Sequence, residues 1–215
     1  MASVDECVVL RRFPTADYSL IAKCYCRNGG LRTFFVPDYF KGEGVPLGSF
    51  EPFNRLKVHF EERNALLVGL DVSDLREEAS RISRSPERFE FLSKVAGTVL
   101  RYAPEADEGI FELLSRAIDV EDFFGFNLLR FWLSFSSVLG FSLERLSRPG
   151  WVNLMTLSDC REDEVKNPYC VYLSPREFAL LKRVGDPKTK PFEVPRRELK
   201  NLEEFFEKFL AYHKG

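Results

Sequence analysis

The chain has 215 residues, of which 45% are hydrophobic and 30% are charged, the balance of an ordinary globular protein. This composition excludes a disordered tail, a collagen-like repeat and a small disulfide-rich scaffold. The formal net charge of −2 gives no overall attraction to polyanions, so any nucleic-acid site has to be a local patch of separated charge.

The N-terminal residues and the cysteines of the chain predict its cellular compartment. Residues 2–6 resemble neither the basic nor the apolar part of a secretory signal, and an odd number of Cys, five, predicts reduced thiols in the cytoplasm. The stretch 123–143 has the length of a membrane span, but it contains Arg130, two Gly and four Ser. A buried helix at the centre of a bundle is the favoured interpretation, so no membrane association is expected, and a membrane span is the alternative.

The first 72 residues carry patterns typical of β-strands. In the segment 18–26, Ala22 and Cys24 fall on one face and Lys23 on the other, and two glycines that favour a hairpin follow at 29–30. The predicted strands are 7–13, 18–26, 31–36, 56–60 and 65–72. Five short strands in this length predict an OB-fold barrel over residues 1–73, with an SH3-like barrel as the structural alternative.

From residue 74 onward the hydrophobic spacing becomes that of helices. Asp74 with Glu77 has the spacing of a capping box, and Ser85 before Pro86 is typical of a second helix start. Residues 148–172 break the helical pattern and predict an irregular module. We therefore expect an α+β chain, in which the barrel leads into an α-helical bundle domain over residues 74–215 that includes the C-terminal helices.

Six short segments follow one another in an order that a known family shares. They are Val8-Val9-Leu10-Arg11-Arg12, Asp17-Tyr18-Ser19-Leu20-Ile21, Asn28-Gly29-Gly30-Leu31-Arg32, Gly48-Ser49-Phe50-Glu51-Pro52-Phe53, Ile110-Phe111-Glu112-Leu113-Leu114 and Leu139-Gly140-Phe141. This order resembles that of the bacterial RecO family of DNA-repair and recombination proteins. No one segment is specific, and the order carries the resemblance.

The chain departs from the RecO pattern in two places. Residues 36–41 offer one cation, Lys41, where the family usually has a run of Lys and Arg. The first Cys-x-x-Cys pair of the family's zinc module is absent from residues 142–148, and Cys170 has no cysteine two residues away. A structural zinc needs four convergent ligands, which Cys160 and Cys170 do not supply, so we expect a zinc-lacking member without a bound metal.

The resemblance implies a non-enzymatic role in DNA repair. A RecO-type protein binds and anneals single-stranded DNA, assists RecA loading together with RecR, and docks the acidic, aromatic tail of single-strand-binding protein on its helical domain. It implies a cytoplasmic, nucleoid-associated location. The sequence has no P-loop, nucleophile elbow, deaminase signature or Rossmann glycine fingerprint, so neither catalysis nor a cofactor is expected. The alternative is a protein-interaction adaptor with little DNA affinity of its own.

Candidate site residues follow from how proteins hold single strands, with basic side chains on phosphates and aromatic rings under bases. In the barrel, the candidate stacking residues are Tyr25, Phe34 and Tyr39. The alternative is a solvated barrel exterior, since residues 1–72 hold nine cations and nine anions. The candidate barrel cations are Arg11, Arg12, Lys23, Arg27, Arg32, Lys41, Arg55 and Lys57.

A second basic stretch lies near the C-terminus, where residues 182–200 hold seven basic and three acidic side chains. It is either an extension of a phosphate-binding track or a solvated loop; its candidate DNA-binding residues are Lys188, Lys190, Arg196 and Arg197. Arg116 and Arg130 are cations on otherwise apolar helices and are the candidates for partner binding. Snorkelling at the edge of the bundle is their alternative role.

Overall fold

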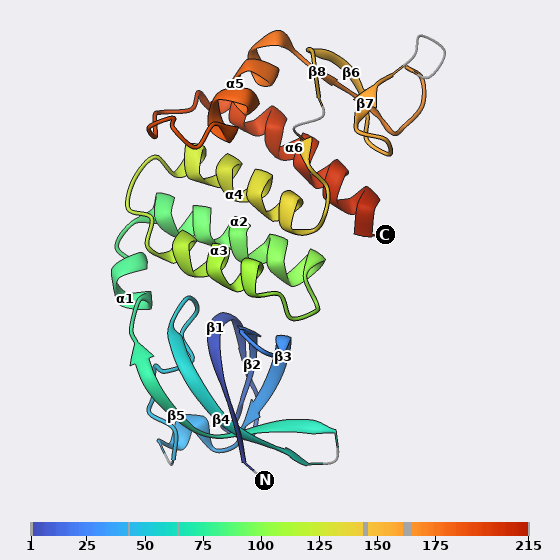
Figure 1. The fold of residues 1–215 in the computed structure, drawn as a ribbon. Helices are drawn as coiled ribbons and strands as arrows, with labels where there is room; N and C mark the ends of the chain where they lie inside the picture. Colours follow the sequence, from blue (N-terminus) through green and yellow to red (C-terminus); the bar gives the residue numbers. More distant parts are fainter. Residues whose placement is uncertain (1, 43, 64, 144–145, 161–164, 215) are drawn as a thin grey trace. The chain divides into compact units, whose positions relative to one another are not determined.

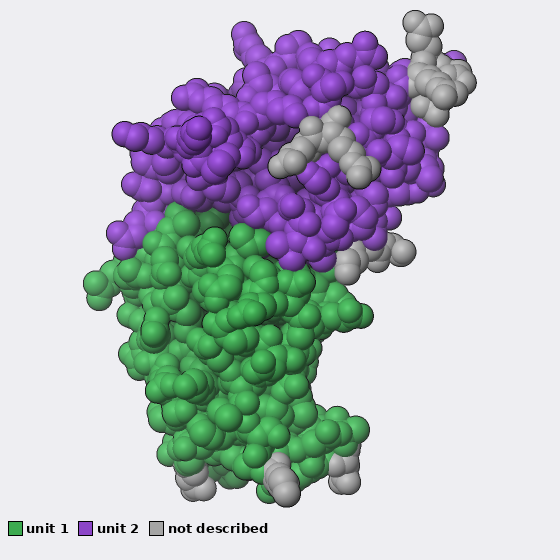
Figure 2. Space-filling model, viewed as in Figure 1, with its two compact units in different colours: residues 1–120 green, residues 121–215 purple. Residues whose placement is uncertain are grey.

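A computed structural model describes residues 2–42, 44–63, 65–143, 146–160 and 165–214. The chain divides into two compact units, Met1–Val120 (unit 1) and Glu121–Gly215 (unit 2), each with its own colour in Figure 2. Residues 161–164, which belong to the segment predicted to be irregular, lie outside the described part of the chain.

The first part of unit 1 is a closed five-stranded β-barrel (Figure 1). Its strands are β1 (Ser3–Pro14), β2 (Leu20–Cys26), β3 (Gly30–Val36), β4 (Arg55–Arg63) and β5 (Leu66–Arg76). The order β1-β2-β3-β5-β4 closes through antiparallel pairing of β1 with β4, and β3 runs parallel to β5. The predicted OB-type barrel, followed by helices, is confirmed. Strands β1, β3 and β4 extend beyond the predicted ends, β5 ends four residues later than predicted, and β2 starts two residues later than predicted, at Leu20.

The barrel interior is filled by alternate residues of each strand, as period-2 burial requires. Ala22 and Cys24 of β2 belong to the core, together with Phe34 of β3 and Phe60 of β4, whose rings meet edge to face 5.3 Å apart. The predicted assignment of Lys23 to the opposite face of β2 therefore agrees with the structure, since Lys23 is outside this core.

The expectation of reduced thiols is wrong for four of the five cysteines in this structure. Antiparallel pairing places Cys7 opposite Cys26, with 4.1 Å between their Cα atoms, and the two form a disulfide. A second disulfide joins Cys160 to Cys170. Cys24 remains a free thiol in the barrel core, where burial raises its pKa. Strand register, which a spacing along the chain does not reveal, brings the first pair together.

Three helices complete unit 1: α1 (Ala79–Ile82), α2 (Pro86–Tyr102) and α3 (Glu108–Ile118). The predicted helix start at Ser85 is confirmed, since its side chain accepts a hydrogen bond from the backbone N–H of Arg88. The predicted capping box at Asp74 and Glu77 is wrong, because β5 continues through Asp74 and α1 starts later. The N–H groups of Glu78 and Ala79 instead donate to the side-chain oxygen of a distant residue, Asn54.

Helices α2 and α3 lie at one end of the barrel (Figure 1), and polar contacts join the barrel to the turn between them and to the start of α3. The Tyr25 hydroxyl donates to the backbone oxygen of Glu105 at 2.8 Å and accepts from the N–H of Asp107 at 3.1 Å. Arg27 reaches Glu108 on α3 at 2.9 Å. The strands thus end near the predicted boundary at 73/74, but the compact unit extends to Val120 and includes these helices.

Unit 2 combines three long helices with a small sheet. Its elements are α4 (Phe124–Val138), β6 (Gly150–Asn153), β7 (Ser158–Asp159), β8 (Cys170–Leu173), α5 (Pro175–Gly185) and α6 (Arg196–Lys214). The segment predicted to be irregular contains the antiparallel sheet β7-β6-β8. Helix α4 packs against α5 and α6, with the rings of Trp132 and Phe206 centred 5.3 Å apart. No helix in the described ranges is long and apolar enough to cross a membrane.

A complete capping box starts α5 and predicts a pH-dependent contribution to the stability of unit 2. Ser174 accepts from the N–H of Glu177, whose carboxylate accepts from the N–H of Ser174 at 2.8 Å and from the side-chain amide of Asn201 at 2.6 Å. Burial raises the pKa of Glu177, whereas these hydrogen bonds and the charge of Arg197 lower it, and the net pKa lies below the ordinary 4.5.

A carboxyl group whose pKa falls on folding stabilises the fold above its ordinary pKa and loses that contribution as the pH drops. We therefore expect Glu177→Gln to lower the free energy of unfolding of unit 2 by about 1 kcal/mol at pH 7, and by progressively less below about pH 4.5. Both tryptophans, Trp132 and Trp151, lie in unit 2, so their fluorescence in urea measures this transition. The control is Glu207→Gln, which changes an exposed residue of α6. If Glu177→Gln lowered the free energy of unfolding equally at pH 7 and below about pH 4.5, the charged form of Glu177 would not be the stabilising group.

Candidate nucleic-acid interface

Six of the eight candidate barrel cations lie beside carboxylates. The shortest N–O distances are 2.7 Å for Arg12–Glu51, 2.9 Å for Arg27–Glu6, 3.7 Å for Arg32–Asp5, 2.6 Å for Lys41–Asp38, 2.7 Å for Arg55–Glu78 and 2.6 Å for Lys57–Asp74. Each carboxylate cancels much of the field of its partner. The eight cations therefore do not form one basic groove.

The remaining two cations, Arg11 and Lys23, are neighbours. They face each other across β1 and β2, and neither has an ion-pair partner in the described part of the chain. A shift of register between Val9 and Arg11 gives β1 an extra residue there. Strict alternation would put Arg11 on the same face as Val9, in the core, whereas the bulge turns it outward beside Lys23.

Aromatic and aliphatic side chains lie beside this pair of cations. The strand register forms two rows, Arg11–Lys23–Thr33 and Phe13–Ile21–Phe35, both outside the barrel core. We call these six residues the outer face of β1–β3. The Arg11 guanidinium carbon lies 4.9 Å from the centre of the Phe13 ring, which is 36% exposed.

The loop between β1 and β2 and the segment after β3 each add one exposed ring. Tyr18 in this loop is 61% exposed, and its backbone oxygen accepts a hydrogen bond from the N–H of Phe40, which is 37% exposed. Phe40 belongs to a short 3-10 helix, η1 (Tyr39–Lys41). Lys41 lies 6.0 Å from the centre of the Tyr18 ring. The β1–β2 loop and η1 thus combine exposed aromatic surface with a cation, Lys41, that is also paired to Asp38.

The predicted stacking residues are wrong, because Tyr25, Phe34 and Tyr39 are all fully buried. Phe34 fills the core, and the hydroxyl of Tyr39 accepts hydrogen bonds from the N–H groups of Gly48 and Phe50. Tyr25 points away from the core but is covered by residues 105–107. Burial raises its pKa to about 12, so the hydroxyl stays protonated. The exposed rings of Phe13, Tyr18 and Phe40 were not predicted, and their exposure depends on the tertiary fold.

The arrangement has the chemistry of a single-strand platform. Cations that lack carboxylate partners can neutralise phosphates, and exposed rings can stack under bases. OB-fold barrels use the faces of strands 2 and 3 and the loop between strands 1 and 2 for oligonucleotides and oligosaccharides. Lys23, Thr33 and Phe35 lie on those two strands, and Tyr18 lies in that loop.

The C-terminal candidate cations belong to unit 2. Lys188 and Lys190 are exposed between α5 and α6, and Arg196 and Arg197 begin α6. Of the two partner-binding candidates, Arg116 is exposed on α3 of unit 1. Arg130 on α4 donates to the backbone oxygens of Val184, Asp186 and Thr189, so it fastens the start of the α5–α6 connection and is engaged within its own unit.

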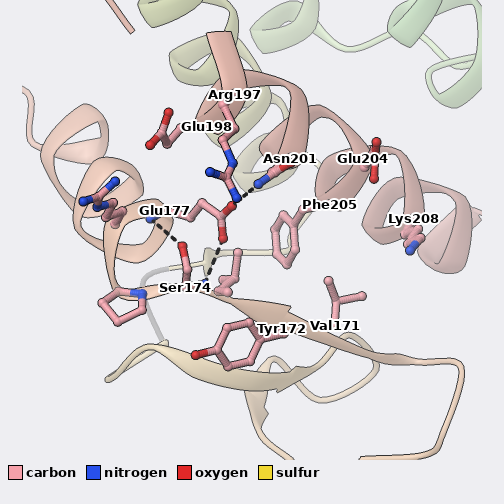
Figure 3. Close-up of a pocket in the computed structure, with 13 residues that line it drawn as sticks. Val171, Tyr172, Ser174, Glu177, Arg197, Glu198, Asn201, Glu204, Phe205 and Lys208 are labelled. Atoms are coloured by element: carbon pink, nitrogen blue, oxygen red, sulfur yellow. Dashed lines mark hydrogen bonds between the residues drawn. The ribbon is translucent and has the colours of Figure 1, made fainter. Parts of the chain in front are cut away.

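Unit 2 contains an open groove of about 600 Å³, shown in Figure 3. One wall is the continuous chain from Val171 to Glu177, and the other is one face of α6, including Arg197, Phe205 and Lys208. Strand β8 is at the edge of its sheet, so one side of its backbone has no strand partner within the described residues. Such an edge can pair with an extended peptide.

Among the described residues, no group of three or more His, Cys, Asp or Glu side chains is arranged to hold a metal ion. Cys160 and Cys170 are joined to each other by a disulfide. The polar groups of the outer face and of the groove can bind charged or hydrogen-bonding partners without a cofactor.

Comparison with known proteins adds a distant relative. No family model matches the sequence. The chain is 30% identical over 109 residues to an uncharacterized protein of Aquifex aeolicus (strain VF5), an alignment that covers 51% of this chain and 50% of the relative. The chain therefore spans about half the length of the relative that it matches, and this similarity assigns no activity.

Proposed function

We propose that the protein binds and anneals single-stranded DNA and serves as a recombination mediator that assists RecA loading together with RecR. The observation that carries the strand-binding part is the outer face of β1–β3, where Arg11 and Lys23 lie beside Phe13 and have no carboxylate partner among the described residues. The RecO resemblance of the sequence supplies the role in DNA repair and the partners.

Annealing in this proposal requires no covalent step. Two complementary strands repel each other through their phosphates, and cations that neutralise part of this charge reduce the repulsion. Exposed rings hold bases by stacking, which is tolerant of sequence and leaves the base edges available for pairing. Because only two of the eight candidate barrel cations lack ion pairs in the described chain, the predicted binding is weak and sensitive to salt.

Fluorescence anisotropy of a labelled oligothymidine strand, titrated with the protein over a salt series, tests the proposal. Each phosphate contact contributes about −0.7 to the slope of log affinity against log salt for single strands, so two contacts predict a slope of about −1.4. A steeper slope would indicate that the C-terminal cations also bind the strand. No binding at low salt would reject strand binding and leave the adaptor function.

The groove in unit 2 favours a second candidate function, docking of a partner peptide such as the acidic, aromatic tail of single-strand-binding protein. Arg176, Arg197 and Lys208 line the groove, and Tyr172 lies across it from Phe205, as Figure 3 shows. Glu177, Glu198 and Glu204 also line the groove, so its cations can complement single acidic side chains and its rings can contact aromatic ones. An acidic, aromatic peptide should bind more tightly to the wild-type chain than to the Lys208→Ala variant. Equal affinity for the two proteins would exclude this groove as the docking site.

A further inference from the structure

A second polar pocket, of about 530 Å³, lies at the end of the barrel where β2 has stopped and the chain turns into β3. Its lining includes Asp5, Asn28, Arg32, Phe60, Glu62 and Leu67, which come from four strands and from the β2–β3 turn. None of these residues belongs to the outer face of β1–β3. The pocket therefore is a separate feature of the same unit.

The pocket contains a buried carboxylate that is only partly satisfied. Asp5 is 3% exposed, and its Oδ1 atom accepts hydrogen bonds from the backbone N–H of Asn28 at 3.1 Å and from the side-chain amide of Asn28 at 3.0 Å. Its Oδ2 atom lies 3.7 Å from the Arg32 guanidinium, which is too long for a hydrogen bond. Oδ2 accepts no hydrogen bond from the described residues and is not a fully buried atom, so it keeps acceptor capacity toward the pocket.

Packing, more than the ion pair, fixes the guanidinium beside this oxygen. The Arg32 guanidinium carbon lies 5.1 Å from the centre of the Phe60 ring, and Phe34 supports that ring from the core. On its other side Arg32 lies against Gly29, where a Cβ atom would come within 1.8 Å of its Nε atom. A side chain at position 29 would therefore displace Arg32, so the glycine keeps room for the guanidinium.

A carboxylate oxygen and a guanidinium held side by side match the edge of a nucleobase. Guanine presents two adjacent donors, N1–H and N2–H, next to the acceptor O6, so a carboxylate can accept from the donors while a guanidinium donates to the oxygen. Adenine and cytosine offer the carboxylate one amino group beside a ring acceptor. Thymine has a single N–H between two oxygens, one of which would face the carboxylate.

We propose that this pocket binds a base of the bound single strand, with a preference for guanine. The inference rests on the proposed strand binding, because β3 carries both features: Thr33 points to the outer face and Arg32 lines the pocket. Asp5 accepts from the guanine donors, and Arg32 donates to its O6 atom. Single-stranded recognition modules read unstacked bases on these edges in the same way.

The test compares an all-thymidine strand with the same strand carrying one central guanine, using anisotropy at low salt. We expect the guanine strand to bind the wild-type chain about tenfold more tightly. Asp5→Asn replaces Oδ2 by a donor and should reduce the ratio to about one. Asp71→Asn, which changes an exposed carboxylate of β5 outside the pocket, is the matched control and should keep the ratio.

A measurement on the wild-type chain avoids dependence on folding of the Asp5 variant. Deoxyguanosine, which has no phosphate, should shift the NMR signals of the Asn28 side-chain amide and the Arg32 Nε–H, and thymidine should not. If both strands bound equally and these NMR signals did not shift, the proposal that the pocket binds guanine would be rejected, while strand binding would stand. Shifts with deoxyguanosine but no binding of either strand would reject strand binding and retain a guanine pocket.

Discussion

Replacing Arg11 and Lys23 together by alanine is expected to lower the affinity for single-stranded DNA by a factor of about one hundred or more at low salt. A hydrogen bond to a charged group contributes about 1.5–3 kcal/mol, and the two cations would each contact a phosphate. The negative slope of log affinity against log salt should become shallower by about 1.4, because the variant makes two fewer phosphate contacts and displaces fewer counterions. Anisotropy titrations of the two proteins at several salt concentrations measure both effects.

The matched control is Lys57→Ala, which removes an exposed cation of the same barrel. Lys57 lies 2.6 Å from Asp74, and the hydrogen bond between them raises the lysine pKa. Because this charge is already compensated, its loss should leave strand affinity within about twofold of the wild-type value. Equal weakening by both changes would mean that the overall charge of the barrel binds DNA, and would contradict a local interface at Arg11 and Lys23.

Asn54→Ala is expected to destabilise unit 1 by about 3 kcal/mol or more. Asn54 is 1% exposed, and its side-chain amide donates to the backbone oxygens of Gly48 and Ser49 at 2.9 and 3.2 Å. Its side-chain oxygen accepts from the N–H groups of Glu78 and Ala79 at 2.9 and 3.1 Å. Truncation removes one partner from each of four backbone groups, and among these the Gly48 oxygen still accepts from the N–H of Glu51. Each buried group that is left unsatisfied costs about 1–3 kcal/mol.

Hydrogen exchange of the intact chain measures this effect locally. In Asn54→Ala, the amides of Glu78 and Ala79 should lose protection, while Trp132 and Trp151 should still report an unchanged unfolding transition of unit 2. Asn54→Asp keeps an acceptor for both amides but loses the two donated bonds, so we expect a smaller loss of stability. Unchanged protection at 78 and 79 in the alanine variant would refute the role of Asn54 as the cap of α1.

Local patterns in the sequence determined the strands and the helix starts that depend on neighbouring residues. Alternation in 18–26 placed Ala22 and Cys24 in the core because side chains of a strand point to opposite faces. The start of α2 at Ser85 was predicted because the cap and the group that it satisfies lie within one turn. The closed barrel followed from five such strands in about 70 residues.

The tertiary structure alone decided which polar and aromatic groups are available to a partner. The bulge places Arg11 outward beside Lys23 of the next strand. Most of the carboxylates beside the cations, such as Glu78 beside Arg55, and the cover over Tyr25 come from residues far away in the chain. The cap of α1 likewise comes from Asn54, more than twenty residues upstream of the helix. Exposure and charge pairing depend on distances through space, and single-sequence patterns report only distances along the chain.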